Sequence, residues 1–236
     1  MQVRCSVCMA TYNGEKTIKS QIDSILIQLD ASDEIIISDD GSSDGTLKIL
    51  TDLNDPRIKI YQNKRKKGPS DNFINALTKV SGQYIFLSDQ DDTWFENKVS
   101  KCIDILQTYD LVLSDAIVVN EEETIIYNSF FEQRRSKKGF INNIRRNSYI
   151  GCCMAFKKTL LDKASPFPEN IHMHDWWLGL VAELTGKVMF YPFPLIKYVR
   201  HGNNASPTLE NSNYSTLKRF TNRWVLFINS IPLLFK

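Results

Sequence analysis

The sequence lacks a strong net charge. Its 236 residues include 29 Lys and Arg and 27 Asp and Glu, so the net charge is only +2 with neutral histidines. This balance argues against a nucleic-acid binder defined by overall charge and against an acidic disordered chain. Glycine and proline are also scarce, with 10 and 8 residues. The composition, with 42% hydrophobic residues, is that of a globular protein with a substantial core, large enough for one large domain or two small ones.

Membrane-spanning and secretory segments are absent as well. No stretch reaches the roughly 20 apolar residues that a spanning helix needs, and residues 1–10 contain no apolar core of a signal peptide. The five cysteines form an odd set without a disulfide framework. Cys5 and Cys8 form a C-x-x-C pair, but residues i and i+3 of a strand point to opposite faces, which favours structural thiols over a metal or redox pair. We therefore expect a cytosolic, reduced protein.

The charges that are present are unevenly distributed. Residues 30–55 hold eight acids and one base, residues 57–67 hold six bases and no acid, and residues 131–163 hold nine bases and two acids. Such segregation is typical either of solvated faces or of a protein that binds an anion and a cation in different places.

Apolar patterns alternate between strand and helix through the first half. We expect strands at 3–9, 34–38, 57–61 and 84–87, and helices at 17–29, 46–53 and 71–80. This alternation predicts βαβ units and a Rossmann-like, mostly parallel sheet flanked by helices. The second half is less regular, with helices expected at 95–109, 175–185 and 214–231, apolar runs at 111–113, 116–119 and 150–156, and a strand at 188–191. It should complete the sheet and build the second side of a cleft.

Polar side chains follow all four strands of the first half. The strand ends read ATYNG at 10–14, SDDGS at 38–42, Asn63 with a basic run to Lys67, and SDQDD at 88–92. Because ligands bind at the carboxyl ends of parallel strands, these ends form a site hypothesis. Neither a G-x-G-x-x-G nor a P-loop motif occurs, so a dinucleotide fold is not indicated. Asp89 and Asp91 instead offer the hard oxygen ligands that Mg²⁺ or Mn²⁺ prefers beside phosphates.

Six motifs in this order resemble those of family 2 glycosyltransferases, which have the nucleotide-diphospho-sugar transferase (GT-A) fold. They are ATYN at 10–13, SDDGSSDGT at 38–46, SDQDDTW at 88–94, GCCMAF at 151–156, HDWW at 174–177 and RHGNN at 200–204. The last three are most similar to bacterial polysaccharide rhamnosyl- and glucosyltransferases. The resemblance implies a GT-A domain at 1–205, with a nucleotide-sugar half at 1–94 and an acceptor half at 95–205, followed by an amphipathic tail at 206–236.

The resemblance implies roles in donor binding. Tyr12 would stack on a pyrimidine, and Asp40 would accept a hydrogen bond from the base N3–H, which favours a UDP- or dTDP-sugar. Other donor contacts would come from Thr11, Asn13, Asn63, Lys67, Asp89 and Gln90. Asp91 and His201 would hold Mn²⁺ or Mg²⁺, and the imidazole favours Mn²⁺.

The resemblance also implies a catalytic group and an acceptor side. Asp175 would be the general base that deprotonates the acceptor hydroxyl. Trp176, Trp177 and Gly151 would face the acceptor, a glycan or lipid-linked oligosaccharide. A single base and direct displacement predict inversion at the anomeric carbon. Many relatives carry Glu before the base, where this chain has His174.

Several of these residues have plainer interpretations. Asp40 could serve turn and helix-capping chemistry, Tyr12 could be a packed aromatic, and His201 could be a surface histidine. Asp175 also suits a helix start, and the two tryptophans suit a core. The pattern from His172 through His174 to Asp175 could instead be a metal cluster.

The C-terminal tail carries an apolar helical face beside basic residues. Leu217, Phe220, Trp224, Phe227, Ile228 and Ile231 share that face. Such a helix lies on an anionic membrane surface or packs on its own domain. Membrane contact would place the enzyme peripherally on the inner face of the cell membrane.

Three functions therefore remain open. A metal-dependent inverting glycosyltransferase of bacterial surface polysaccharides is the first, and an inert nucleotide-sugar-binding or scaffold module is the second. A nucleotidyltransferase is the third, but the TYNGE sequence at 11–15 lacks the glycine-rich basic loop which that class needs after its first strand. None of them implies a nucleic-acid partner.

Overall fold

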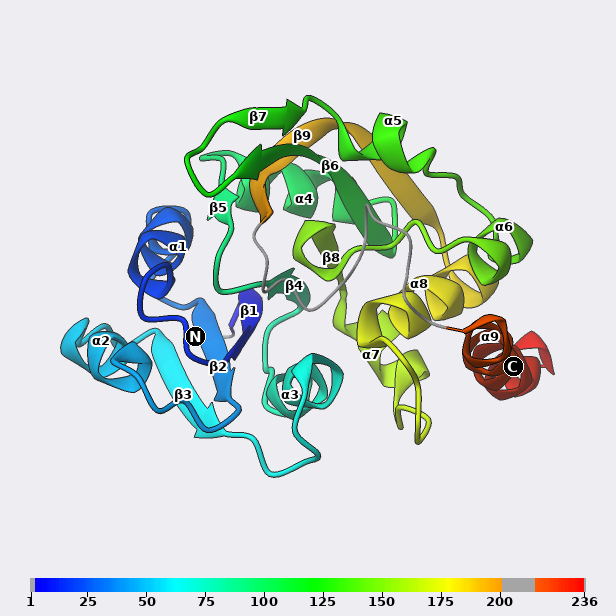
Figure 1. The fold of residues 1–236 in the computed structure, drawn as a ribbon, viewed down its shortest axis with the longest axis horizontal. Coiled ribbons are helices and arrows are strands. Elements are labelled where there is room, and N and C mark those ends of the chain that lie inside the picture. Colours follow the sequence, from blue (N-terminus) through cyan, green and yellow to red (C-terminus); the bar gives the residue numbers. More distant parts are fainter. Residues whose placement is uncertain (1–2, 201–214, 236) are drawn as a thin grey trace.

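The computed structural model describes residues 3–200 and 215–235. Within these residues, nine strands form one sheet in the order β3-β2-β1-β4-β8-β6-β9-β5, with β7 paired to β6 (Figure 1). The sheet divides into a parallel first half and a mixed second half. Helices lie on both sides of it, as the α/β pattern predicts.

The first half is the predicted run of βαβ units. Its elements are β1 (Cys5–Thr11), α1 (Ile18–Leu26), β2 (Glu34–Asp39), α2 (Thr46–Asp52), β3 (Ile58–Gln62), α3 (Pro69–Leu77) and β4 (Tyr84–Ser88). All pairs among these strands are parallel. The β-branched run of Ile35, Ile36 and Ile37 is fully buried, because both faces of a parallel sheet are covered by helices. Cys5 and Cys8 are buried free thiols, as expected of structural cysteines.

The second half extends the same sheet with antiparallel partners. Its elements are β5 (Thr93–Trp94), α4 (Lys98–Leu106), β6 (Leu111–Asn120), β7 (Ile125–Tyr127), α5 (Phe130–Arg134), α6 (Phe140–Arg145), η1 (Gly151–Cys153), β8 (Met154–Lys157), α7 (Lys158–Ala164), α8 (His174–Thr185) and β9 (Val188–Arg200). Strand β8 is antiparallel to both β4 and β6, whereas β6 and β9 are parallel. Strand β9 ends nine residues beyond residue 191, where the sequence pattern predicted its end.

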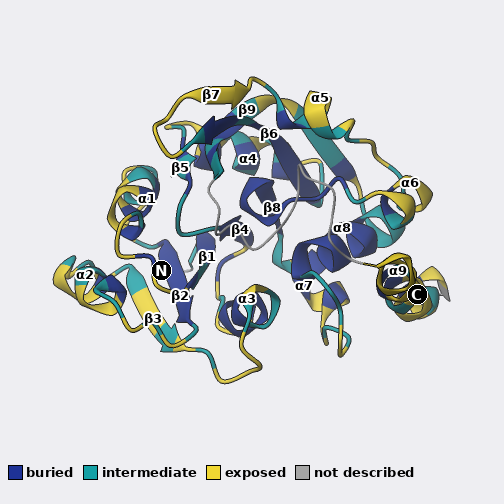
Figure 2. Ribbon diagram, viewed as in Figure 1, coloured by how far each residue is buried: buried dark blue, intermediate teal, exposed yellow. Residues whose placement is uncertain are grey.

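The core follows the central strands. β1, β2, β4 and β8 are almost wholly buried, whereas the outer surfaces of α2, β7 and α9 are exposed (Figure 2). Helix α8 is buried over most of its length, from His174 to Ala182. The side chains in the first turn of α8 are therefore held in place against the sheet.

The C-terminal helix α9 (Thr216–Ser230) packs on α6 and α8 and continues into η2 (Ile231–Phe235). The side chains that it buries are Asn222, Leu226 and Ser230. The large apolar residues face outward instead, with Leu217 at 75%, Phe220 at 62% and Trp224 at 53% exposure. The helix thus packs on the domain and still leaves an apolar face uncovered by the described residues. No helix in these residues is long and apolar enough to cross a bilayer.

Candidate functional site

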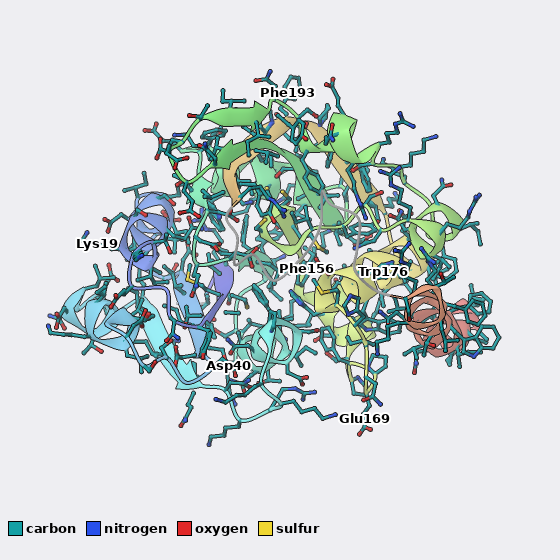
Figure 3. All side chains as sticks on the ribbon, in the orientation of Figure 1. Lys19, Asp40, Phe156, Glu169, Trp176 and Phe193 are labelled. Carbon is teal, nitrogen blue, oxygen red and sulfur yellow. The ribbon has the colours of Figure 1, made fainter. Side chains whose placement is uncertain are left out.

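One large cleft of about 1390 Å³ runs across the carboxyl ends of β1, β2 and β4. Its walls continue onto α3, α6, α8 and α9. Asp40 lies beside the end of β2, and Trp176 lies at the other side on α8 (Figure 3). The cleft therefore joins the two halves that the sequence predicts for donor and acceptor.

The ends of β1 and β4 are held together by one side-chain amide. Gln90 Oε1 accepts from the Tyr12 backbone N–H at 2.9 Å, and Gln90 Nε2 donates to the Tyr12 carbonyl at 3.1 Å. This clamp leaves the Tyr12 side chain 53% exposed on the cleft wall, as stacking on a base requires. Asn13 adopts a φ of 49°, and its Oδ1 accepts from the Ser43 N–H at 2.9 Å. Gln90 and Asn13 thus shape the wall that presents Tyr12.

The two adjacent aspartates at the end of β2 have different roles. Asp39 is buried and accepts hydrogen bonds from the Thr11 hydroxyl at 3.0 Å and the Ser42 N–H at 2.9 Å. It is therefore the turn residue. Asp40 lines the cleft, where its carboxylate accepts from Asn63 Nδ2 at 2.8 Å and the Gly68 N–H at 2.7 Å. A carboxylate has about four lone-pair positions, so Asp40 still has acceptor capacity for a base N–H.

The other residues predicted to contact the nucleotide sugar fall into two groups. Thr11, Lys67 and Asp89 line the cleft, although the Thr11 side chain is buried and donates to Asp39. Asn63 does not line the cleft; it holds the Asp40 carboxylate and donates to the Lys66 carbonyl at 3.1 Å. Asn63 therefore positions Asp40.

Three acids follow β4 within four residues. Asp89 and Asp91 are half-buried on the cleft wall, and Asp92 is buried and accepts from the Val199 N–H at 3.1 Å. Burial, followed by the negative charges of Asp91 and Asp89, raises the pKa of Asp92 well above its ordinary value. A bound divalent cation would reduce the repulsion among these carboxylates.

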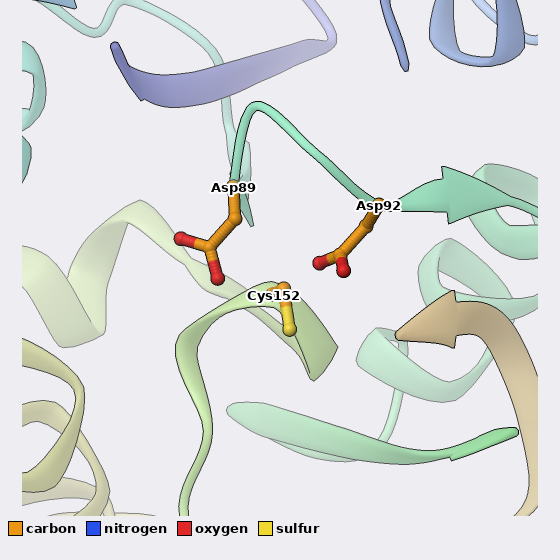
Figure 4. A group of neighbouring side chains, drawn as sticks. All are labelled: Asp89, Asp92 and Cys152. Atoms are coloured by element: carbon orange, nitrogen blue, oxygen red, sulfur yellow. The ribbon is translucent and has the colours of Figure 1, made fainter. Parts of the chain in front are cut away.

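A possible metal cluster among the described residues joins Asp89, Asp92 and Cys152, with one ligand atom from each within 4.8 Å of the others (Figure 4). The two carboxylates suit Mn²⁺ or Mg²⁺, whereas a thiol is a soft ligand. Burial, a hydrogen bond with Cys153 and the nearby Asp92 charge raise the pKa of Cys152 well above its usual range, which keeps it protonated. The carboxylates therefore fit a hard cation and the thiol does not. The predicted ligand Asp91 is outside this cluster, and His201 lies outside the described residues.

Asp175 stands in the first turn of α8, on the cleft wall. Its Oδ2 accepts from the Gly151 N–H at 3.0 Å and its Oδ1 from the Trp176 N–H at 2.6 Å. Both bonds favour the ionised form, but burial outweighs them and raises the pKa of Asp175 to about 6. The result is a fixed carboxylate that is ionised at neutral pH and still basic enough to take a proton.

His174 is buried beside this carboxylate, and its ring stacks on Phe73 with centroids 4.2 Å apart. Neither ring nitrogen has a hydrogen-bond partner among the described residues. Burial lowers the pKa of His174 to about 3, so the ring is neutral. With unpaired nitrogens and Asp175 bonded to backbone N–H groups, the residues that are described here do not form the alternative His-His-Asp metal cluster.

The predicted acceptor-side residues do not all reach the cleft. Gly151 and Trp176 line it, and Trp176 Nε1 donates to the Asn143 carbonyl at 2.9 Å, which fixes α6 to α8. Trp177 points into the core, where its Nε1 donates to the Ala164 carbonyl at 2.9 Å. Trp177 is therefore a core residue, the plainer of its two interpretations.

The sequence interpretation missed five arginines on the cleft wall. They are Arg134, Arg145, Arg146, Arg219 and Arg223. The excess of bases at residues 131–163 was a signal for three of them, but a charge count does not reveal which side chains face a common space. It missed the Asp92–Cys152 contact for the same reason.

Comparison with known proteins finds one family. The family model described as "Glycosyl transferase family 2" matches residues 6–164. An Escherichia coli protein, UDP-Glc:alpha-D-GlcNAc-diphosphoundecaprenol beta-1,3-glucosyltransferase WfgD, is 33% identical over 219 residues, which cover 91% of this chain and 82% of that protein. The dTDP-rhamnosyl transferase RfbG of Shigella flexneri is 29% identical over 242 residues, covering 92% and 80%.

Solved structures show the same fold. Residues 1–349 of S. aureus TarS in complex with UDP-GlcNAc superpose with a TM-score of 0.68 at 20% identity, covering 99% of this chain and 76% of that one. The mannosyltransferase PcManGT from Pyrobaculum calidifontis, in complex with GDP-Man and Mn²⁺, has a TM-score of 0.62 at 19% identity, covering 87% and 59%.

Proposed function

The chain belongs to glycosyl transferase family 2, and we propose that it is an inverting hexosyltransferase acting on a lipid-linked acceptor of bacterial surface-polysaccharide synthesis. The donor would be a UDP- or dTDP-sugar, and the acceptor group a glycan hydroxyl. The names of the E. coli and Shigella relatives support both parts, since one includes UDP-Glc and a diphosphoundecaprenol acceptor and the other a dTDP-rhamnosyl group.

The observation that carries this proposal is the buried carboxylate of Asp175 on the wall of the same cleft that the polar strand ends line. Its two backbone hydrogen bonds hold it in one orientation, and its pKa of about 6 leaves it ionised at neutral pH. It would take the proton of the acceptor hydroxyl while that oxygen attacks the anomeric carbon. Attack on the face opposite the leaving diphosphate inverts the anomeric configuration.

The donor would bind across the ends of β1, β2 and β4. Tyr12 offers a half-exposed ring for the pyrimidine, and Asp40 accepts the N3–H that uracil and thymine share. Asn63 and the Gly68 N–H fix the orientation of that carboxylate. Thr11, Asn13 and Gln90 would support this wall, and Lys67 would approach the phosphates.

Asp89 and Asp91 would hold Mn²⁺ or Mg²⁺ at the end of β4, together with His201. A bound divalent cation supplies charge stabilisation of the leaving nucleoside diphosphate. The protein's own part is to place these carboxylates on the cleft wall, beside the buried Asp92.

The proposal is tested by replacing Asp175 with Asn and measuring nucleoside diphosphate release from a panel of UDP- and dTDP-sugars with Mn²⁺. We expect turnover to fall by at least about a hundredfold, while UDP binding, measured by calorimetry, stays within about twofold. The control is Asp162→Asn, which removes an exposed carboxylate of α7. Near-full turnover by Asp175→Asn would refute the base assignment. Donor binding without turnover by the wild type with lipid-linked acceptors would favour the inert module instead.

We also propose that the exposed apolar face of α9 contacts an anionic membrane, which would place the enzyme on the inner face of the cell membrane. Phe220, Trp224 and Phe227 form a stacked row, with neighbouring ring centroids 6.1 Å apart. Aromatic side chains beside Lys and Arg suit the headgroup region. Co-sedimentation with phosphatidylglycerol vesicles should fall on Phe220→Ser/Trp224→Ser and not on Phe193→Ser, which alters an equally exposed ring of β9. Equal sedimentation of all three proteins would contradict the contact.

A further inference from the structure

One end of the cleft is lined by arginines. Arg134 comes from α5, Arg145 and Arg146 from the end of α6, and Arg219 and Arg223 from α9. We call these five residues the arginine wall. α6 and α9 lie side by side although about 75 residues separate them in the chain (Figure 1). None of the described acidic residues that line the cleft belongs to α5, α6 or α9.

Two of the hydrogen bonds that orient the arginine wall go to neutral backbone carbonyls. Arg134 Nε donates to the Asn147 carbonyl at 3.0 Å, and Arg223 Nη2 donates to the Arg145 carbonyl at 2.9 Å. Among the residues that the structure describes, no carboxylate forms an ion pair with Arg145, Arg146 or Arg223. Burial and the nearby charge of Arg146 lower the pKa of Arg134. Cations gathered in this way suit an anionic ligand.

Two further observations point to a ligand rather than to a solvated face. Arg223 Nε is buried without a hydrogen-bond partner in the described chain, although the residue lines the cleft. A second hollow of about 390 Å³ beside α6 shares Arg145 and Arg146 with the cleft, and its other charged residues are Arg135 and Lys137. The positive surface is therefore larger than a single phosphate needs.

The arginine wall is close to the proposed base. Only five peptide units separate Arg146 from Gly151, which spans at most about 18 Å, and the Gly151 N–H donates to Asp175. The indole N–H of Trp176, next to Asp175, donates a hydrogen bond to the Asn143 carbonyl of α6. An anion at the wall would thus lie near Asp175, on the part of the cleft wall that α6, α8 and α9 form.

We propose that the arginine wall binds the diphosphate that joins the acceptor glycan to its lipid, an inference that rests on the proposed function. Arginine suits this group because its planar fork binds phosphate oxygens in pairs. The lipid would continue along α9. Trp224 directly follows Arg223, about 100° further round the helix, so the exposed row of Phe220 and Trp224 adjoins the wall.

The test is binding of farnesyl diphosphate by calorimetry, with UDP and Mn²⁺ at saturation so that the donor site is filled. We expect Arg145→Gln/Arg146→Gln to bind at least about tenfold more weakly. Lys64→Gln/Lys66→Gln, which removes two exposed charges outside the cleft, should bind like the wild type. Arg145→Lys/Arg146→Lys should bind with intermediate affinity, because the charge remains and the fork is lost. Arg223→Gln is the second variant if the double glutamine variant does not fold.

Each part of the proposal has its own result that would refute it. Equal farnesyl diphosphate binding by the wild type, the glutamine double variant and Arg223→Gln would refute the wall as the site. Farnesol binding as tightly as farnesyl diphosphate would refute the role of the diphosphate. Inorganic diphosphate binding as tightly as the lipid would refute the lipid part and assign the wall to a soluble anion. Absence of both UDP and dTDP binding by the wild type would instead refute the proposed donor, and is read from titrations with these nucleotides alone.

Discussion

Replacing Asp175 with Asn should change how the stability of the protein depends on pH. The carboxylate is buried, and its pKa of about 6 in the folded protein lies above its ordinary value of 3.8. The folded state therefore binds this proton more tightly than the unfolded state. Stability from this group is fully present below pH 3.8 and is lost as the pH rises through about 6.

The size of the effect follows from the two pKa values. They differ by about 2 units, and one unit corresponds to 1.36 kcal/mol, so the ionised carboxylate costs the folded state about 3 kcal/mol above pH 7. Asn carries no such charge. It does lose one of the two acceptor oxygens that face the Gly151 and Trp176 N–H groups, which costs about 1–3 kcal/mol at every pH. Only the pH-dependent part therefore reports the ionisation.

The measurement is urea unfolding of both proteins at half-unit steps from pH 4.5 to 8. The difference in unfolding free energy should move by about 2–3 kcal/mol in favour of Asp175→Asn as the pH rises. Other buried acids, such as Asp92, are common to both proteins and cancel. Parallel curves would show that Asp175 has an ordinary pKa, which would remove the physical basis for its role as a base. In the wild type, kcat/KM should rise with pH through about 6.

Three further predictions concern the support of the site. Gln90→Glu should weaken UDP binding about tenfold by calorimetry, because a carboxylate would face the Tyr12 carbonyl in place of the amide N–H; unchanged affinity would contradict the clamp. Gly179→Ala should lower the unfolding free energy by about 2–3 kcal/mol in urea, because its Cβ would overlap the Tyr149 ring; an unaltered midpoint would contradict this packing. His174→Phe should raise the unfolding free energy by about 1 kcal/mol, since it removes two unpaired buried nitrogens; a loss above 1 kcal/mol would indicate an unrecognised partner.

The first half of the fold could be predicted because its pattern is local. The buried run at Ile35–Ile37 and the apolar spacing of α1 each identify an element within a few residues. Parallel strands joined by helices then have few possible arrangements. The polar strand ends follow from this topology, so Tyr12, Asp40 and Asp89 reach the cleft wall as expected.

The second half of the fold could not be predicted in the same way, because its strands pair with segments that are distant in the sequence. Strand β6 was expected as two short apolar runs, yet it is continuous from Leu111 to Asn120. It pairs with β9 along its whole length, and with β8 and β7 near its two ends. Polar residues such as Ser114 and Asp115 interrupt the apolar pattern but are buried. Ser129 donates to Asp115 at 2.5 Å from a segment 14 residues away, and no local rule anticipates that bond.

The same limit applies to function, because adjacent side chains of one motif point to different places. Asp39 and Asp40 cannot be distinguished in the sequence. Because side chains alternate along the end of β2, Asp39 hydrogen-bonds within the turn and Asp40 lies on the cleft wall. Trp176 and Trp177 separate in the same way on α8, since neighbours on a helix lie about 100° apart; one supports α6 beside the cleft and the other fills the core.

The near-neutral charge of the chain has a physical meaning in the cleft. An acidic donor end would repel a diphosphate, so the proposed metal would be needed there to bring the nucleotide sugar onto Asp89 and Asp91. At the other end the arginine wall would attract a diphosphate without any metal, as we propose above. Two diphosphates of the same charge would otherwise compete for one site, and in our proposal the opposed signs assign each to its own end of the cleft that Asp175 also lines. The separation of charge would thus allow donor and acceptor to occupy the cleft together.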